Sequence, residues 1–194
     1  MSRAPFPWLT LGVVAAAAAL SLSRPELFEY LRGAVERGEA WRLLTGQLVH
    51  WTPRMAVIDL AAVALLGTWL ERVARRRTLV LALALALPLI ALTVHLLSPT
   101  LTRYRGSSGL AAALFLALAA RLWIEGRGGA RWLALLAAGG FVLKVVLELA
   151  LGRQLFAGAL PAGIAVTPAV HLAGAAAGLS AAVLVQGSRW EKGR

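Results

Sequence analysis

The chain has 194 residues, 59% of them hydrophobic, and carries a net charge of +11 from 20 basic and 9 acidic residues. This apolar content lies well above the roughly 45–50% of soluble proteins, so the composition predicts one membrane domain over residues 1–194. The absence of cysteine excludes disulfides, thiol nucleophiles and thiolate metal sites, and the sequence has no His-Glu-x-x-His pattern for a zinc protease.

The apolar residues fall into six runs, each near the length of about twenty residues that spans a bilayer. The runs cover residues 6–22, 56–73, 78–97, 108–124, 132–151 and 167–186. They predict an all-α membrane protein built as a bundle of six transmembrane helices. Because most of the arginines flank these runs, the lipid bilayer is the expected partner of the positive charge, and nucleic acid is not.

The first run has two interpretations. Arg3 precedes it and Ser21-Leu22-Ser23 at its end would be the cleavage site of a signal peptide. A retained signal anchor fits better, because no soluble domain follows for export. The polar segment 23–54 comes next, with charged residues alternating with apolar ones, and it predicts a helix lying at the membrane interface. A solvated connector is the alternative.

The short loops set the orientation. Arginines cluster at 72–77 and 121–131, and further basic residues lie at both ends of the chain, so the charge rule predicts that both termini are cytoplasmic. Runs two, four and six then begin at the outer face. Ser108, His171 and the pair His50 and Asp59 lie at these three starts. Polar groups at this depth are costly unless they are satisfied, which makes them functional candidates.

Ser108 lies in the sequence Tyr104-Arg105-Gly106-Ser107-Ser108-Gly109, which opens the fourth run. In the sixth run, Gly174 and Gly178 follow His171 at i+3 and i+7, on one helix face. Small residues at this spacing let two helices approach closely, which would bring the imidazole against the fourth run. Serine and histidine are the minimal pair for nucleophilic catalysis, which requires no metal or cofactor.

Three other features bear on this hypothesis. Lys144 and Glu148, one helical turn apart in the fifth run, are interpreted as a structural ion pair. No acidic residue is identified that would orient His171, so the prediction is a Ser–His dyad. The segment 152–168, rich in glycine and proline, is predicted to be a cap whose movement admits substrate sideways, with an ordinary external loop as the alternative.

These motifs resemble those of the rhomboid family of intramembrane serine proteases. Residues 106–109 fit Gly-x-Ser-Gly, the residues 171–178 fit His-x-x-Gly-x-x-x-Gly, and 39–42 resemble the Trp-Arg segment of the family's first loop. The resemblance implies that Ser108 is the nucleophile and His171 the general base. It also implies transmembrane protein substrates cut near the outer membrane face, in a bacterial inner membrane with the site facing the periplasm or exterior.

The sequence departs from the family pattern on the second helix. Where the family usually has a histidine and an asparagine near the oxyanion, this chain has Met55 and Asp59, and Ala112 replaces a frequent aromatic residue. The oxyanion candidates are therefore the Ser108 amide, Asp59 and His50. Asp59 would donate if protonated; the alternative is a structural pairing with Arg54 or another basic group.

Two further interpretations concern the serines and the branch of the family. The Gly-x-Ser-Gly register selects Ser108 as nucleophile and leaves Ser107 as a helix cap that accepts a bond from a first-turn amide. The Tyr-x-Gly-x-Ser-Gly form and the small size resemble the rhombosortase branch, whose substrates end in a Gly-Gly tail. The rival to an enzyme is a catalytically inactive rhomboid-like protein that binds membrane helices.

Overall fold

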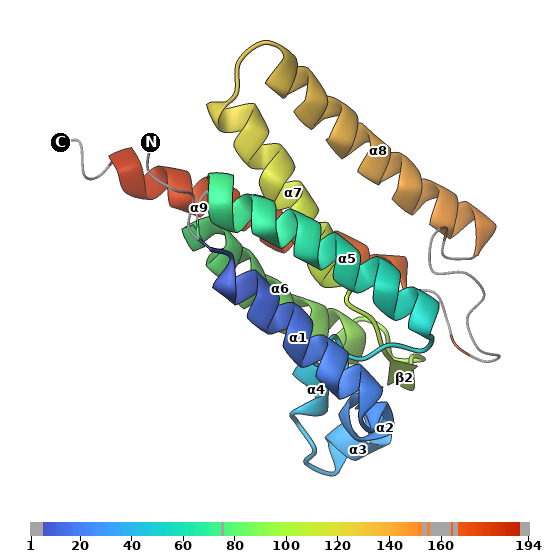
Figure 1. Cartoon of the computed structure of the whole chain (residues 1–194). Coiled ribbons are helices and arrows are strands. Elements are labelled where there is room, and N and C mark those ends of the chain that lie inside the picture. Colours follow the sequence, from blue (N-terminus) through green and yellow to red (C-terminus); the bar gives the residue numbers. More distant parts are fainter. Residues whose placement is uncertain (1–5, 75, 153–154, 156–163, 165–166, 191–194) are drawn as a thin grey trace.

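The computed structural model describes residues 6–74, 76–152, 155, 164 and 167–190. In this part of the chain the protein is mainly helical, and long helices run through the molecule while short elements gather at one end (Figure 1). In chain order the elements are α1 (Trp8–Leu22), α2 (Pro25–Phe28), β1 (Tyr30–Leu31), α3 (Arg32–Glu36), α4 (Arg42–Thr45), α5 (Pro53–Trp69), η1 (Leu70–Ala74), α6 (Arg76–Leu96), β2 (Arg103–Tyr104), α7 (Ser108–Glu125), α8 (Gly129–Leu151) and α9 (Pro168–Trp190).

Each predicted apolar run corresponds to a helix. Five helices of the described chain are long and apolar enough to cross a membrane: α5 with the start of η1, α6, α7, α8 and the first part of α9. The sixth, α1, has 15 residues. At 1.5 Å per residue it spans roughly 22 Å, less than the about 30 Å of a hydrocarbon core. The count of six transmembrane spans therefore stays a prediction.

Local sequence explains how α5 begins, and at its other end the helix is joined to α1 through Glu71. Pro53 occupies its first turn, where a missing N–H costs nothing, and the Thr52 side chain accepts a hydrogen bond from the Met55 amide at 3.2 Å. At its other end α5 continues into the π-helical turn η1, which carries Glu71. The Glu71 carboxylate accepts hydrogen bonds from the amides of Leu9 and Thr10, so it joins η1 to the start of α1.

The prediction of one interfacial helix over residues 23–54 is wrong. The segment forms three short helices and the strand β1, and Gly38, with φ +105°, follows α3 in a conformation that interrupts a helix. Its charged side chains make long-range contacts: Arg32 donates to the carbonyls of His95, in the last turn of α6, and Ser98, just after α6. These bonds fold the segment back on the bundle.

One contact of this segment fixes the start of α7. Strand β1 pairs with β2 in antiparallel register, with Tyr30 opposite Tyr104. Tyr30 also lies beside α6, where its hydroxyl is 3.1 Å from His95 Nδ1. The residues just before Ser108 are thereby paired with the segment between α1 and α5, here called the first loop.

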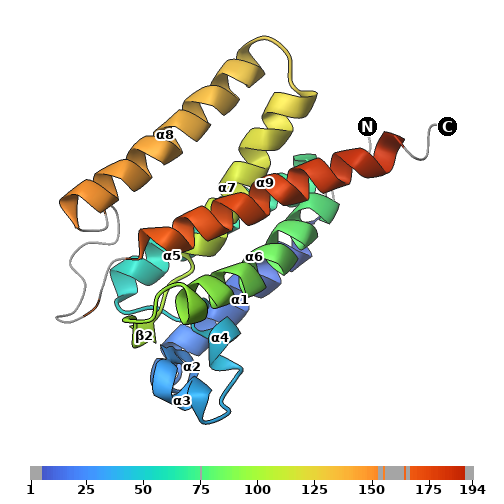
Figure 2. The same ribbon diagram turned by 180° about the vertical axis from the view of Figure 1, so that it is seen from behind.

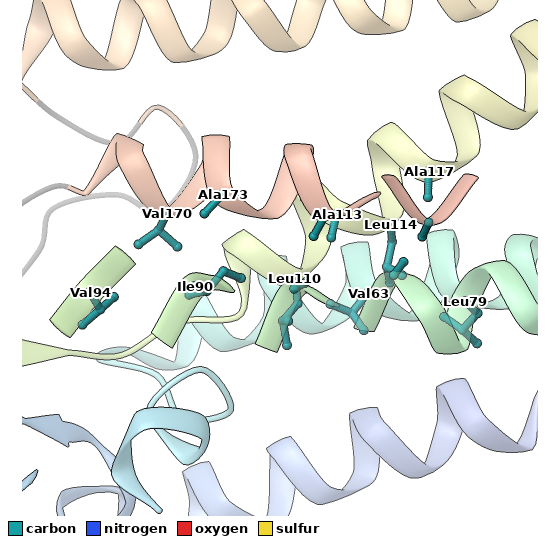
Figure 3. Packing of buried hydrophobic residues seen from close by; sticks show 14 of the residues in the cluster. Val63, Leu79, Ile90, Val94, Leu110, Ala113, Leu114, Ala117, Val170 and Ala173 are labelled. Carbon is teal, nitrogen blue, oxygen red and sulfur yellow. The ribbon is translucent and has the colours of Figure 1, made fainter. Parts of the chain in front are cut away.

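Helix α7 is the centre of the bundle. It packs against α5, α6, α8 and α9, and its buried residues Leu110, Ala113 and Leu114 meet those of α5, α6 and α9 in the main apolar cluster (Figure 3). Seen from behind, α9 lies across α7 and α6, while α8 stands at the edge (Figure 2). Of the described residues, the apolar cluster takes none from α8.

The start of α1 and the end of α9 lie at the same end of the molecule in both ribbon views. The short elements that precede α5 and α7 lie at the other end. This arrangement puts the first turns of α5, α7 and α9 on one side of the bundle, where the candidate residues are found.

Candidate active site

The turn that presents Ser108 is held by its neighbours. Gly106 has φ +142°, which a residue with a Cβ rarely adopts, and an added Cβ would meet Met55 Cε at 2.6 Å. Its amide donates to the Gly46 carbonyl, and its own carbonyl accepts from the Tyr104 hydroxyl at 2.9 Å. Burial raises the pKa of the Tyr104 phenol, which keeps the proton that this bond needs.

Ser107 precedes α7, but the prediction that its side chain caps the helix is wrong. Its hydroxyl makes no capping bond. It donates to the Gln47 carbonyl at 2.8 Å and lies 3.2 Å from His50 Nε2. Neighbours on a helix point about 100° apart, so the two serines face different surroundings. Ser107 is buried against the 46–50 loop, and Ser108 lines a cavity.

Ser108 and His171 come together although they lie on different helices. The Ser108 hydroxyl is 3.0 Å from His171 Nε2. The imidazole is buried, with 3% of its residue surface exposed. This is the distance expected between a nucleophile and its general base.

Glycines make this approach possible. An added Cβ at Gly174 would lie 2.0 Å from the Gly109 carbonyl oxygen, and one at Gly178 would lie 2.0 Å from the Ala113 carbonyl oxygen. Gly109 itself faces Val170 Cγ1, which a Cβ would meet at 2.6 Å. Helices α7 and α9 are therefore in backbone contact along a seam of small residues, and this contact sets the distance between Ser108 and His171.

A carboxylate also reaches the imidazole, which corrects the expectation that no acidic residue lies beside it. Glu148 Oε2 is 3.1 Å from His171 Nδ1, the nitrogen turned away from Ser108. The predicted ion pair with Lys144 is present at 2.7 Å. Lys144 Nζ lies 3.2 Å from the same ring nitrogen, so the pair belongs to the surroundings of His171.

The position of Glu148 in the sequence also points to the site, because it lies near the end of an apolar run. Runs two, four and six begin at the predicted outer face, and by the same alternation run five ends there. Glu148 is three residues before the end of α8 at Leu151, at the depth of Ser108 and His171. Polar residues at the run ends, as well as at the run starts, therefore belong to the predicted outer-face cluster.

A cavity of about 400 Å³ lies beside Ser108 and His171. It is mostly apolar because alanines, leucines and phenylalanines from α5, α7 and α8 form most of its wall, and Ala112 contributes no aromatic ring to it. Its polar groups are those of the site. The lining residues are Ile58, Asp59, Ala62, Leu66, Ser108, Ala111, Ala112, Phe115, Leu136, Ala137, Gly140, Phe141, Lys144, Glu148 and His171.

The oxyanion candidates lie in different places. The Ser108 amide is in the first turn of α7, where amides lack partners within the helix and the dipole favours negative charge. Asp59 lines the cavity and accepts a hydrogen bond from the Ser107 amide at 3.0 Å. His50 contacts Ser107 and lies 3.6 Å from Asp59, but it is not among the cavity-lining residues. Arg54 is exposed, and the basic group that the structure places beside Asp59 is His50, so a structural role for Asp59 stays an alternative.

The predicted cap at 152–168 lies almost entirely outside the described residues. The described part includes Leu155, whose amide donates to Glu148 Oε1 at 3.1 Å.

The sequence matches the family model of the Rhomboid domain over residues 37–188. The chain belongs to the rhomboid family. No curated protein matches the sequence. Rhomboids are serine intramembrane proteases, and the family also has inactive members. The match covers α5 to α9 and most of the first loop, and α1 precedes it.

Proposed function

We propose that this rhomboid is an active serine endopeptidase that cleaves membrane-anchored proteins with Ser108 as nucleophile and His171 as general base. The observation that carries the proposal is the 3.0 Å contact between the Ser108 hydroxyl and His171 Nε2 at the wall of an apolar cavity. Together the two groups have the geometry of nucleophilic catalysis.

The reaction follows from this pair. His171 Nε2 takes the Ser108 proton as the oxygen attacks the substrate carbonyl carbon, and the carbonyl oxygen becomes an oxyanion near the start of α7. The carbon–nitrogen bond then breaks, the leaving amine takes the proton from His171, and an acyl ester remains on Ser108. Water, deprotonated by the same nitrogen, hydrolyses the ester and restores the hydroxyl.

The cavity supports a membrane-embedded substrate. Its apolar wall suits a segment that arrives from lipid, and α8 exposes large apolar side chains such as Leu136 and Leu143 around it. The outer-face position of the site, in a bacterial inner membrane with cytoplasmic termini, is part of the proposal. Reporter fusions after Arg77 and Gly128 are expected to read cytoplasmic, and a fusion after Thr102 external.

A serine-reactive fluorophosphonate tests the activity. The wild type should be labelled, whereas Ser108→Ala and His171→Ala should stay folded and unlabelled. A second candidate, an inactive rhomboid that only binds membrane helices, is favoured by Met55 and Asp59 at the usual oxyanion positions. Absence of label on the wild type would support that candidate and refute the proposal, and label that does not depend on Ser108 would refute the assigned nucleophile.

The substrate class is the finer part of the proposal. The resemblance to rhombosortases points to substrates with a Gly-Gly sequence, one transmembrane helix and a basic end at the carboxyl terminus. A reporter with this tail should be cut by the wild type, and the same reporter with Leu-Leu in place of Gly-Gly should be cut at least about tenfold more slowly. Equal rates would contradict the assignment to this branch without affecting the protease assignment.

A further inference from the structure

Helix α8 brings a carboxylate, from Glu148, and an ammonium group, from Lys144, to the same nitrogen of His171. Glu148 Oε2 is 3.1 Å from Nδ1, and Lys144 Nζ is 3.2 Å from it. The two α8 side chains are 2.7 Å apart. Glu148 is 1% exposed, and its second oxygen accepts from the Leu155 amide, so the carboxylate is held on both sides.

The chemistry of the three groups allows two hydrogen-bond arrangements. A carboxylate only accepts and an ammonium only donates. When Nδ1 carries the proton, it donates to Glu148, and the bare Nε2 faces the Ser108 hydroxyl. When Nδ1 is bare, Lys144 donates to it, the proton sits on Nε2, and His171 has no lone pair toward Ser108. The arrangement with Glu148 can act as a base, and the arrangement with Lys144 cannot.

We propose that Glu148 is a positioning residue that holds His171 in the base-competent tautomer, and that Lys144 competes with it for the same ring nitrogen. The proposal rests on the proposed function, since it concerns the same serine and histidine. Glu148 also stabilises the imidazolium that forms when Ser108 loses its proton, as a carboxylate behind a catalytic histidine does. The catalytic group is then a triad of Ser108, His171 and Glu148, with Lys144 in hydrogen-bond contact with the same histidine.

A purely structural ion pair does not explain the placement. Such a pair needs only its two members and hydrogen bonds to the remaining atoms, whereas here both charges are directed at one edge of the buried His171 ring. Both also line the cavity with Ser108. Helix α8 packs on α7 and also contacts α9, so these contacts depend on where the end of α8 lies relative to both helices.

The experiment compares the rate of fluorophosphonate labelling in four full-length proteins: wild type, Glu148→Gln, Lys144→Met and the double variant. Glu148→Gln should label about 10²- to 10⁴-fold more slowly, the range of a general acid–base contribution, because Lys144 is left to donate to Nδ1. Lys144→Met should label faster than the wild type, by up to about threefold, because the donor that competes with Glu148 for Nδ1 is gone. The double variant should label at least about tenfold faster than Glu148→Gln, since the competing donor is gone.

This recovery separates the proposal from a structural role. If the pair only stabilised the fold, the second substitution would leave the labelling rate of Glu148→Gln unchanged or lower, and that result would overturn the proposal. If Glu148→Gln does not fold, the double variant, which buries no unpaired charge, is compared with Lys144→Met. It should then label at least about tenfold more slowly, and equal rates would overturn the proposal.

A second measurement does not depend on activity. The chain has only three histidines, so selective ¹⁵N labelling of histidine, with His171→Ala for assignment, gives a spectrum that is simple to interpret. Neutral His171 should carry its proton on Nδ1 in the wild type and on Nε2 in Glu148→Gln. An Nε2 proton in the wild type, or no change in Glu148→Gln, would overturn the proposal. If no variant is labelled by fluorophosphonate, the protease assignment fails, and the tautomer still tests this inference.

Discussion

Helices α8 and α9 both have 23 residues and both bring side chains to Ser108, but they are attached to the bundle in different ways. Helix α9 meets the backbone of α7 at Gly174 and Gly178 and contributes to the apolar cluster. Helix α8 contributes nothing to that cluster from its described residues, and it exposes most of its large apolar side chains. In this protein a fixed helix carries the histidine, and a loosely packed helix carries the acid that faces it.

The difference shows that main-chain contacts position one side chain of the site and side-chain contacts position another. At Gly174 and Gly178 the main chain of α9 lies against the main chain of α7, so main-chain atoms set the separation of Ser108 from His171. The position of Glu148 depends on side-chain contacts at the end of α8. The first distance is therefore held by the main chain, and the second depends on the side chains of α8.

The largest expected effect comes from breaking the seam. Gly178→Leu should abolish fluorophosphonate labelling, because a side chain there collides with the Ala113 carbonyl and forces α9 away from α7. Gly139→Leu on α8 is the matched control, since a Cβ at Gly139 meets nothing within 4 Å. It should label at nearly the wild-type rate. Similar losses in both variants would show that the two helices are equally constrained.

Much of the α7–α9 arrangement could be predicted from the sequence because its determinants are local. Gly174 and Gly178 share a helix face with His171, and the register of residues 106–109 distinguishes Ser108 from Ser107. The depth of Glu148 could also be predicted, because it lies at a run end, but its contact with His171 could not, because that contact depends on how closely α8 approaches α9. The sequence equally predicts a self-contained pair of Lys144 and Glu148. The folding of residues 23–54 also escaped prediction, because Arg32 and its neighbours bond to segments far along the chain.

The next expected effect concerns Asp59, on the fixed side of the site. Asp59→Ala removes the acceptor of the Ser107 amide and an oxyanion candidate, and labelling should fall about ten- to a thousandfold. Asp59→Asn should keep most of the activity, because its amide oxygen still accepts and its NH₂ group can donate to the oxyanion. The ratio of the two labelling rates is the measurement. Small and equal effects would remove Asp59 from the oxyanion site.

Ser107→Ala should affect stability and leave the chemistry intact. It removes the bonds of the Ser107 hydroxyl to Gln47 and His50, which should cost about 1–3 kcal/mol of unfolding free energy, because buried polar partners are left behind. Thermal unfolding in detergent measures the loss, and labelling should persist. Label lost here but retained on Ser108→Ala would assign the nucleophile to Ser107.

The smallest effect is expected on the outer face of α8. Leu143 is 58% exposed, and Leu143→Ala should change the unfolding temperature very little, because the side chain meets lipid in both the folded and the unfolded states. Leu114→Ala, at a fully buried position of α7, should cost about 2–5 kcal/mol. Equal losses in the two variants would mean that α8 is packed as closely as the core.

The bonds made by α1 have a consequence for the fold of the rest of the chain. The Glu71 carboxylate accepts hydrogen bonds from the amides of Leu9 and Thr10 and from the Thr10 hydroxyl. Hydrogen bonds to a charged group contribute about 1.5–3 kcal/mol each to stability. At the other end of α1, Ser21 lies 3.0 Å from His50, the histidine that contacts Ser107. Removal of this helix would therefore leave Glu71 without these partners and take the Ser21 contact from His50. The part that the family model matches, residues 37–188, thus folds against a helix that the match does not include.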